Sequence, residues 1–218
     1  MRLLILGATG GTGRALIDQA RTRSHQVTAF VRSPKKLGAP RDGVIVRRGD
    51  PLDAVQVRDV LAGHDAVLSA LGAPGPGRTT ILRDSSRVIV DAMRDAGVRR
   101  LLVVSAAILF DGIGFFPAVM RRTLLRNIFT DAAAMERTIA SSDLEWTIAR
   151  PPRLTNGPLT KRYRVADGRM PPGKLTVSRA DVADFLLDEV EEKRHVHAIV
   201  GIAAVRGDAP STSGEPVW

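Results

Sequence analysis

Cysteine is absent from this chain of 218 residues. Its absence excludes a disulfide framework, thiolate chemistry and any metal site built on cysteine. Long hydrophobic runs are also lacking. The apolar run at residues 3–6 is too short for a signal peptide, and the longest apolar stretch, residues 101–110, falls far below the roughly 20 residues that span a bilayer. We therefore expect a cytoplasmic protein without stable membrane insertion.

Acidic residues are in the minority, with 23 against 32 basic residues and a net charge of +9. Such a balance raises the question of nucleic-acid binding. The basic residues are nevertheless scattered, the local runs are only pairs such as Arg47-Arg48 and Arg99-Arg100, and no aromatic-plus-basic motif occurs. We therefore predict no nucleic-acid partner, and we expect the positive field to attract an anionic small molecule.

Signatures of a metal site and of a serine hydrolase are missing as well. The one close pair of histidines, His195-x-His197, has no carboxylate signature beside it beyond residues 191–192, so we predict no metal site. No Gly-x-Ser-x-Gly elbow is present, which argues against a Ser-His-Asp hydrolase.

Alternating strand and helix patterns are what the chain does contain. Strands are expected at residues 2–6, 26–31, 43–47, 65–70, 100–105 and 145–149, and helices at residues 11–23, 52–62, 78–97, 118–141 and 178–192. Such alternation predicts an α/β fold, a Rossmann-type doubly wound parallel sheet with helices on both faces.

Proline and glycine interrupt the chain from Pro151 onward. A short strand at about 160–166 and a last strand at 197–203 are expected there. Ser178 is a candidate helix N-cap, with Asp181 as an acidic capping-box variant. We interpret residues 151–190 as a small C-terminal substrate-side subregion of one domain, residues 1–205, followed by a disordered tail, residues 206–218.

The glycines at the start of the chain indicate a phosphate-binding turn. Gly7, Gly10 and Gly13 follow the first strand and open the first helix. In that context the first glycine permits a tight turn, the second lets the backbone approach a pyrophosphate, and the third lets the helix pack closely on the strand. The phosphate would meet the N–H groups at the helix N-terminus.

The residues after the second strand favour NADPH over NADH as cofactor. NAD-binding versions carry an acidic residue there to hold the ribose 2′-hydroxyl. This chain has Arg32-Ser-Pro-Lys-Lys36 and no acid, and a guanidinium can hold phosphate oxygens bidentately. Gly7, Arg32, Asp50, Gly72 and Ser105 each follow an expected strand end, so a parallel sheet would bring them to one rim.

Several motifs together resemble the atypical short-chain dehydrogenase/reductases. They are Gly7-Ala-Thr-Gly-Gly-Thr-Gly13, Thr28-Ala-Phe-Val-Arg-Ser-Pro34, Gly49-Asp50, Asp65-Ala-Val-Leu-Ser-Ala-Leu-Gly72, Val103-Val-Ser105, Leu144-Glu-Trp-Thr-Ile-Ala-Arg-Pro-Pro152 and Ser178-Arg-Ala-Asp-Val-Ala183. The chain looks like the NAD(P)H-binding branch that contains flavin reductase/biliverdin-IXβ reductase and NmrA-like proteins. The resemblance covers about residues 1–200.

This resemblance implies particular cofactor contacts. The pyrophosphate would lie at Gly7, Thr9, Gly10, Thr12 and Gly13, the 2′-phosphate at Arg32 and Lys36, the adenine at Asp50 and Pro51, the ribose path at Ala70, Leu71 and Gly72, and the nicotinamide between Ser105 and Pro151-Pro152.

The chain also departs from its relatives. Ordinary short-chain dehydrogenases use a Tyr-x-x-x-Lys pair, whereas residues 37–160 contain neither tyrosine nor lysine, and the single tyrosine is Tyr163. Flavin/biliverdin reductases typically place a histidine after Pro-Pro and another on the helix that begins near Thr130-Asp131. Arg153 and Ala132-Ala133 stand there instead, which argues against bilin reduction.

The remaining chemistry favours an acceptor that needs no strong acid. Flavins and quinones accept hydride readily and can take their proton from solvent, so we expect NADPH as cofactor and a flavin, if used, as substrate rather than prosthetic group. Ser105 and Arg153 are the catalytic candidates, and Arg153 could attract an anionic acceptor. Phe110, Phe115 and Phe116 form either a lid over a flat substrate or a packing or dimer contact.

Two other functions stay open at this point. One is a cofactor-sensing regulator resembling NmrA, which binds NADP(H) without catalysis and is favoured by the missing Tyr-Lys pair. The other is a reductase or epimerase of a specialised metabolite. The sequence is compatible with a monomer or a homodimer.

Overall fold

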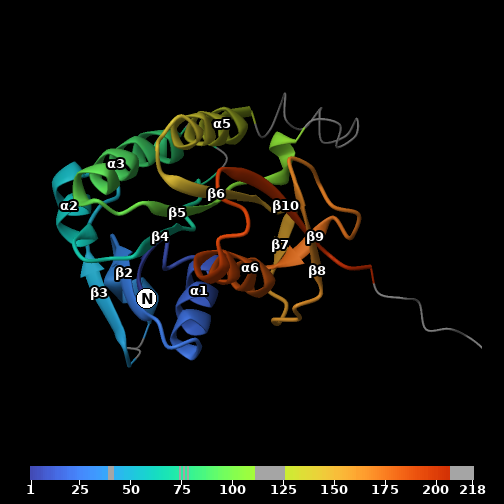
Figure 1. The fold of residues 1–218 in the computed structure, drawn as a ribbon, viewed down its shortest axis with the longest axis horizontal. Helices are drawn as coiled ribbons and strands as arrows, with labels where there is room; N and C mark the ends of the chain where they lie inside the picture. The colour runs from blue at the N-terminus through green and yellow to red at the C-terminus, as the bar shows by residue number, and fades with distance from the viewer. Residues whose placement is uncertain (39–41, 74, 76, 78, 111–125, 207–218) are drawn as a thin grey trace, which may run out of the picture.

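A twisted eight-stranded sheet forms the centre of the molecule (Figure 1). The computed structural model describes residues 1–38, 42–73, 75, 77, 79–110 and 126–206. The strand order is β3-β2-β1-β4-β5-β6-β10-β8, and β8 alone runs antiparallel to its neighbour among these strands. Their bounds are Arg2–Leu6 for β1, Gln26–Val31 for β2, Val44–Arg48 for β3, Ala66–Ser69 for β4, Arg100–Val104 for β5, Glu145–Arg150 for β6, Tyr163–Asp167 for β8 and Ala198–Ala204 for β10.

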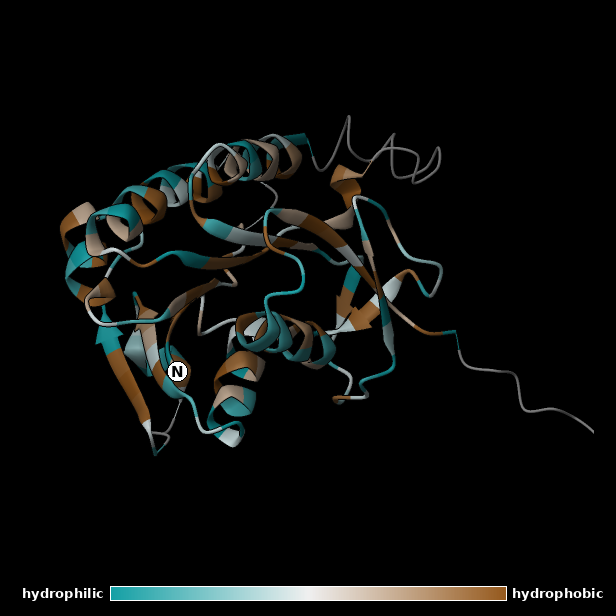
Figure 2. Cartoon of the chain, viewed as in Figure 1, coloured by the Kyte–Doolittle hydropathy of each residue, from teal (hydrophilic) through white to brown (hydrophobic). Residues whose placement is uncertain are grey.

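Helices cover both faces of this sheet. The helices α1 (Gly11–Thr22) and α6 (Arg179–Glu192) lie on one face, and α2 (Ala54–Leu61), α3 (Ile81–Ala96) and α5 (Arg126–Ala140) lie on the other (Figure 1). The first strand shows how the sequence produces two cores: Leu3 and Ile5 pack with α1 and α6, whereas Leu4 and Leu6 pack on the opposite side. Figure 2 shows the hydrophobic colour along strands of the sheet and in bands on the helices that cover it. The predicted Rossmann-type fold is confirmed.

Capping side chains, and not hydrophobic periodicity alone, set the starts of α2 and α6. The carboxylate of Asp53 accepts hydrogen bonds from the backbone N–H groups of Val55 and Gln56, so α2 begins two residues later than predicted. At α6 the predicted N-cap is confirmed, because Ser178 Oγ accepts from the N–H of Asp181 at 2.9 Å.

The second half of the expected capping box differs from the prediction. The Asp181 carboxylate does not close the box but accepts from the N–H and hydroxyl of Thr160 and from the N–H of Lys161. Asp181 is only 1% exposed, so its charge is compensated by these donors. The side chain thereby ties the 160–161 turn to the start of α6.

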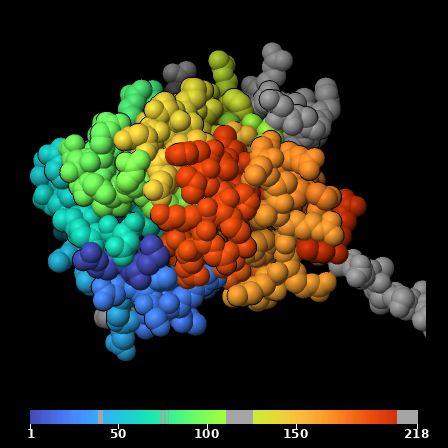
Figure 3. Space-filling model, in the orientation of Figure 1, coloured from blue at the N-terminus to red at the C-terminus, as the bar shows by residue number. Residues whose placement is uncertain are grey.

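Two short strands in the C-terminal subregion were not expected. The strands β7 (Arg153–Thr155) and β9 (Thr176–Ser178) form a separate parallel pair. Three residues are too few for a periodic pattern, which explains why the sequence did not indicate them. Figure 3 shows the orange atoms of this subregion against the red atoms of α6 and β10.

Some expected features lie outside the described residues: Phe115, Phe116, the part of the 118–141 helix before Arg126, and the tail from residue 207. Within the described ranges, no helix is long and apolar enough to cross a membrane. The same ranges hold no group of three or more histidine or acidic residues suited to a metal ion.

Candidate cofactor site

The glycine-rich turn joins β1 to α1 at the edge where the parallel strands end. Gly7 has φ +71°, and a Cβ there would lie 2.4 Å from the Ala70 carbonyl oxygen. A Cβ on Gly13 would lie 2.3 Å from the Gly7 carbonyl oxygen, so Gly13 allows close helix packing rather than ligand contact. Both positions therefore exclude side chains for steric reasons.

The N-terminus of α1 is left without a side-chain partner. Gly10 is the N-cap and offers no side chain, and the first turn carries no acidic residue. The N–H groups of this turn and the positive end of the helix dipole therefore remain available to an anion. This arrangement is the one that phosphate groups occupy in dinucleotide-binding folds.

A cleft of about 360 Å³ opens beside this turn. It lies next to β1 and β4, where the strand order reverses and where open α/β sheets bind ligands. Nine of the predicted cofactor residues line it together: Gly7, Thr9, Gly10, Thr12, Arg32, Pro51, Ala70, Leu71 and Gly72. These residues come from the ends of β1, β2 and β4 and from the turns that follow β1 and β3, as expected for one rim.

A second hollow, of about 470 Å³, adjoins the cleft and shares Arg32 with it. It is lined by Arg32, Arg48, Gly49, Asp50 and Gln56. Neither arginine forms an ion pair or a side-chain hydrogen bond with the described part of the chain. Asp50 is oriented by the turn, because its Oδ1 accepts from the N–H of Leu52. Two guanidinium groups without a direct ion pair among the described residues thus line the same hollow, together with the Asp50 carboxylate.

Arg48 was missed by the sequence analysis, and the predicted contact of Lys36 with the 2′-phosphate stays a prediction. Arg48 pairs with Val31 across β2 and β3, which brings it beside Arg32. Its position at the end of the third strand could have indicated that it lies at the same rim as the other candidate residues. Lys36 lies in the short helix η1 (Pro34–Leu37) and lines neither hollow, while its carbonyl accepts from Arg14.

Ser105 and the Pro151-Pro152 turn lie at the same sheet edge but do not line the cleft. The N–H of Ser105 donates to Ala149 at 2.7 Å, and the carbonyl of Pro151 accepts from Ala107 at 2.8 Å. Ala107 belongs to the short helix η2 (Ala107–Leu109) that follows β5. The Ser105 hydroxyl is buried and has no hydrogen-bond partner among the described residues. A buried hydroxyl without a hydrogen-bond partner is uncommon in folded proteins.

Phe110 is part of the packing rather than an exposed lid. It is 4% exposed, and the Arg150 guanidinium lies 4.6 Å from the centre of its ring. Arg150 in turn donates to both carboxylate oxygens of Glu136 on α5. Of the two interpretations of this residue, a substrate lid or a packing contact, the burial of Phe110 favours the packing contact. Arg153, the other candidate for substrate binding, is exposed at the start of β7.

The single tyrosine lies away from the cleft. The Tyr163 hydroxyl donates to Asp184 at 3.0 Å, and burial together with the charge of Asp184 raises the pKa of Tyr163 far above its ordinary value. Tyr163 therefore keeps its proton and is engaged elsewhere.

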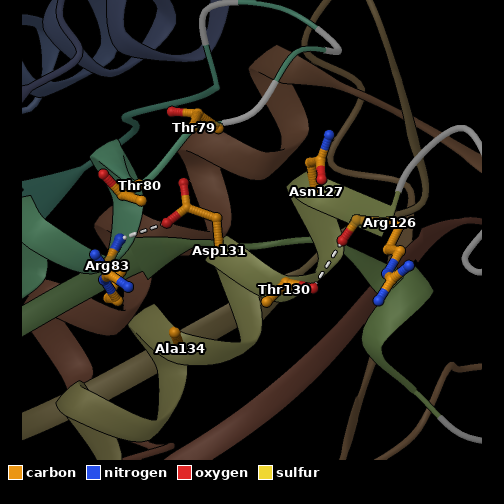
Figure 4. Close-up of a pocket in the computed structure, with 8 residues that line it drawn as sticks. All are labelled: Thr79, Thr80, Arg83, Arg126, Asn127, Thr130, Asp131 and Ala134. Atoms are coloured by element: carbon orange, nitrogen blue, oxygen red, sulfur yellow. Dashed lines mark hydrogen bonds between the residues drawn. The ribbon is translucent and has the colours of Figure 1, made fainter.

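A larger hollow, of about 530 Å³, lies between the N-terminal ends of α3 and α5 (Figure 4). The Asp131 carboxylate points to the start of α3 and accepts from the N–H groups of Leu82 and Arg83, so it already occupies that helix end. All lining residues except Ala134 are polar.

A family model described as NAD(P)H-binding matches residues 7–193. A 3-diazoavenalumate denitrifying reductase from a Streptomyces species is 31% identical, over 96% of this chain and 73% of that protein. A Streptococcus pneumoniae structure provisionally assigned as an NADH-flavin reductase is 25% identical with a TM-score of 0.78, over 94% of this chain and 99% of that one. A Veillonella parvula short-chain dehydrogenase/reductase in complex with NADP has the same fold, with 21% identity, a TM-score of 0.75 and coverage of 97% and 95%.

Proposed function

Because the chain belongs to the NAD(P)H-binding family, with oxidoreductases among its relatives, we propose that it is a reductase that uses NADPH to reduce a flavin, a quinone or a similar conjugated acceptor. One observation carries the cofactor assignment: the glycine-rich cleft continues through Arg32 into a hollow lined by two arginines. A dinucleotide with a 2′-phosphate matches this arrangement, with its pyrophosphate at the glycine-rich turn and its 2′-phosphate at the arginines.

The residues of the cleft fit this cofactor. The free N–H groups at the start of α1 would hold the pyrophosphate, Ala70 to Gly72 would line the ribose path, and Arg32 would hold the 2′-phosphate. Asp50 and Pro51 would border the adenine. When bound, NADPH supplies the hydride, so the chain has to provide orientation more than chemistry.

Proton supply limits the choice of acceptor. The chain lacks a Tyr-x-x-x-Lys pair, and Tyr163 is bound to Asp184. Ser105 is the candidate donor to the nicotinamide amide or the acceptor, since its hydroxyl has no partner among the described residues. Arg153 would attract an anionic group of the acceptor. Acceptors that take their proton from solvent suit such a site, and the likeness to a provisional NADH-flavin reductase supports this class.

Cofactor binding followed by turnover tests the proposal. NADPH and NADH binding would be measured by fluorescence, and NADPH oxidation would then be followed with FMN, riboflavin and a small quinone panel. We expect turnover in the wild type and a weaker NADPH affinity in Arg32→Ala. Arg47→Ala, which removes the same charge outside both hollows, is the matched control. Absence of NADPH binding would refute the cofactor assignment.

Two alternatives compete with the acceptor class. The missing Tyr-Lys pair favours a regulator that binds NADP(H) without turnover, and tight binding with no oxidation in the panel would support it. The likeness to a reductase of a diazo-substituted carboxylate favours a specialised conjugated metabolite as acceptor. Turnover of such an anionic aromatic compound, but of no flavin or quinone, would support that alternative.

A further inference from the structure

Arg179 reaches the cofactor cleft from the far end of the chain. It is the first residue of α6 and lines the cleft with Gly11 and the rest of the glycine-rich turn. Its aliphatic part lies directly over Gly11, because a Cβ there would come within 2.5 Å of Arg179 Cδ and 2.9 Å of Nε. Gly11 therefore leaves room for this arginine.

The guanidinium group of Arg179 is held in place by neutral partners. Its Nη1 donates to Asn156 Oδ1 at 2.7 Å and, more weakly, to the carbonyl of Leu154 at 3.5 Å. No carboxylate among the described residues pairs with it. A guanidinium carries five N–H donors, so the fork is fixed while donors and the full charge remain available.

Two positive features thus border one cleft. The uncapped N-terminus of α1 and the Arg179 side chain both line it, and they lie next to each other at Gly11. Like-signed features placed together are unfavourable unless an anion lies between them. Arginine suits a phosphate there because it can donate two parallel, charge-assisted hydrogen bonds.

We propose that Arg179 is a pyrophosphate ligand contributed by the C-terminal half of the chain, with Asn156 as its positioning residue and Gly11 as the space for its stem. The inference rests on the proposed cofactor and adds a residue to its binding site. Since Leu154 lies in β7 and Asn156 follows it directly, pyrophosphate binding would also connect the cofactor to the substrate-side strand that carries Arg153.

Three ligands separate a pyrophosphate contact from a 2′-phosphate contact. NADPH, NADH and adenosine 2′-monophosphate, which lacks a pyrophosphate, would be titrated by calorimetry. Arg179→Ala should raise the Kd of NADPH and NADH by the same factor, about 10- to 100-fold, and leave the Kd of adenosine 2′-monophosphate unchanged. Arg32→Ala should show the opposite pattern, weakening NADPH and adenosine 2′-monophosphate but sparing NADH.

Control variants exclude effects of charge and folding. Arg164→Ala removes an exposed arginine of β8 from the same subregion and should bind all three ligands as the wild type does. Thermal unfolding without ligand checks that each variant folds. Arg179→Lys should recover only part of the affinity, because it keeps the charge but loses the fork.

Gly11→Ala gives an independent test that keeps the arginine. The methyl group should displace the Arg179 side chain, which can move, and so weaken NADPH and NADH as Arg179→Ala does. In the double variant the Gly11→Ala change should add nothing, because the displaced group is already gone.

The outcomes distinguish this inference from the proposed function. Equal losses for NADPH and NADH in Arg179→Ala, with a non-additive double variant, support the inference. Unchanged affinities in a folded Arg179→Ala protein overturn it and leave the NADPH assignment intact. If the wild type binds neither dinucleotide, both the proposed function and the inference fail.

Discussion

Arginine provides the cationic side chains of the candidate site. Arg32, Arg48 and Arg179 border the cleft and its adjoining hollow, whereas the lysines of the chain line neither. A planar guanidinium binds phosphate through two parallel hydrogen bonds, which an ammonium group cannot do. In the proposed complex these three arginines would contact the phosphate groups of the dinucleotide.

Arg48 should contribute to the choice between NADPH and NADH. We expect Arg48→Ala to weaken NADPH by about tenfold and NADH hardly at all, since one charge-assisted hydrogen bond is worth about 1.5 kcal/mol or more. The Kd of each dinucleotide, measured by fluorescence, checks this. Arg47→Ala, the neighbour that lines neither hollow, is the charge-matched control. Equal losses for both dinucleotides would contradict a role at the 2′-phosphate.

Gly13 should tolerate no side chain although it lies in a helix. Alanine favours a helix over glycine by about 1 kcal/mol. At Gly13, however, its Cβ would lie 2.3 Å from the Gly7 carbonyl oxygen, which is backbone and cannot move aside. We expect Gly13→Ala to lower the free energy of unfolding by about 2 kcal/mol in urea titrations. Gly72→Ala is the control, because no atom of the described residues lies within 4 Å of a Cβ there; equal stability of the two variants would refute this explanation.

At the level of elements, the start of α6 connects strand β9, helix α6 and the 160–161 turn. Ser178 caps the helix, and Asp181 holds the 160–161 turn through three hydrogen bonds. We expect Ser178→Ala to cost about 1 kcal/mol of unfolding free energy. Asp181→Ala should cost more, about 2–3 kcal/mol, because it leaves several donors unpaired. Denaturant titrations give the order, and a larger effect of Ser178→Ala would contradict it.

Sequence patterns predicted the strands of the sheet more completely than they predicted which residues line the candidate site. The first six strands were within two residues of their observed ends, because each is a short apolar run followed by a turn signal. Strands β7 and β9 have three residues each and show no periodicity. Arg48 and Arg179 reach the site through strand pairing and helix packing, which depend on contacts distant in the sequence. The roles of Ser105 and Arg153 remain predictions.

At the level of the whole molecule, acidification should lower stability through His64 in particular. Burial, with the charge of Arg2 contributing, lowers the pKa of His64 below its ordinary value of 6.5. Below pH 6.5 the unfolded chain therefore binds a proton at this residue more readily than the folded one does. The free energy of unfolding should fall as the pH drops from 7 to 5.

His64→Gln should make this pH dependence shallower. The measurement is a series of urea titrations between pH 5 and 8 on the wild type and the variant. The imidazole Nε2 lies 2.8 Å from Thr28 Oγ1, so the variant loses some stability at every pH. Only the change in the slope of unfolding free energy against pH, between pH 7 and 5, reports protonation of His64. An unchanged slope would show that His64 does not carry the effect.

The packing of α1 against α6 has a consequence for synthesis on the ribosome. The first of these helices ends at Thr22, whereas the second begins at Arg179 and adjoins it in the folded chain. At about 5–20 residues per second, the second helix is made roughly 8–30 seconds after the first. During that interval Leu16, Ile17 and Ala20, which are buried in the finished core, lack the α6 residues that pack with them in that core. The nascent chain therefore exposes a segment that chaperones can bind until its last fifth has emerged.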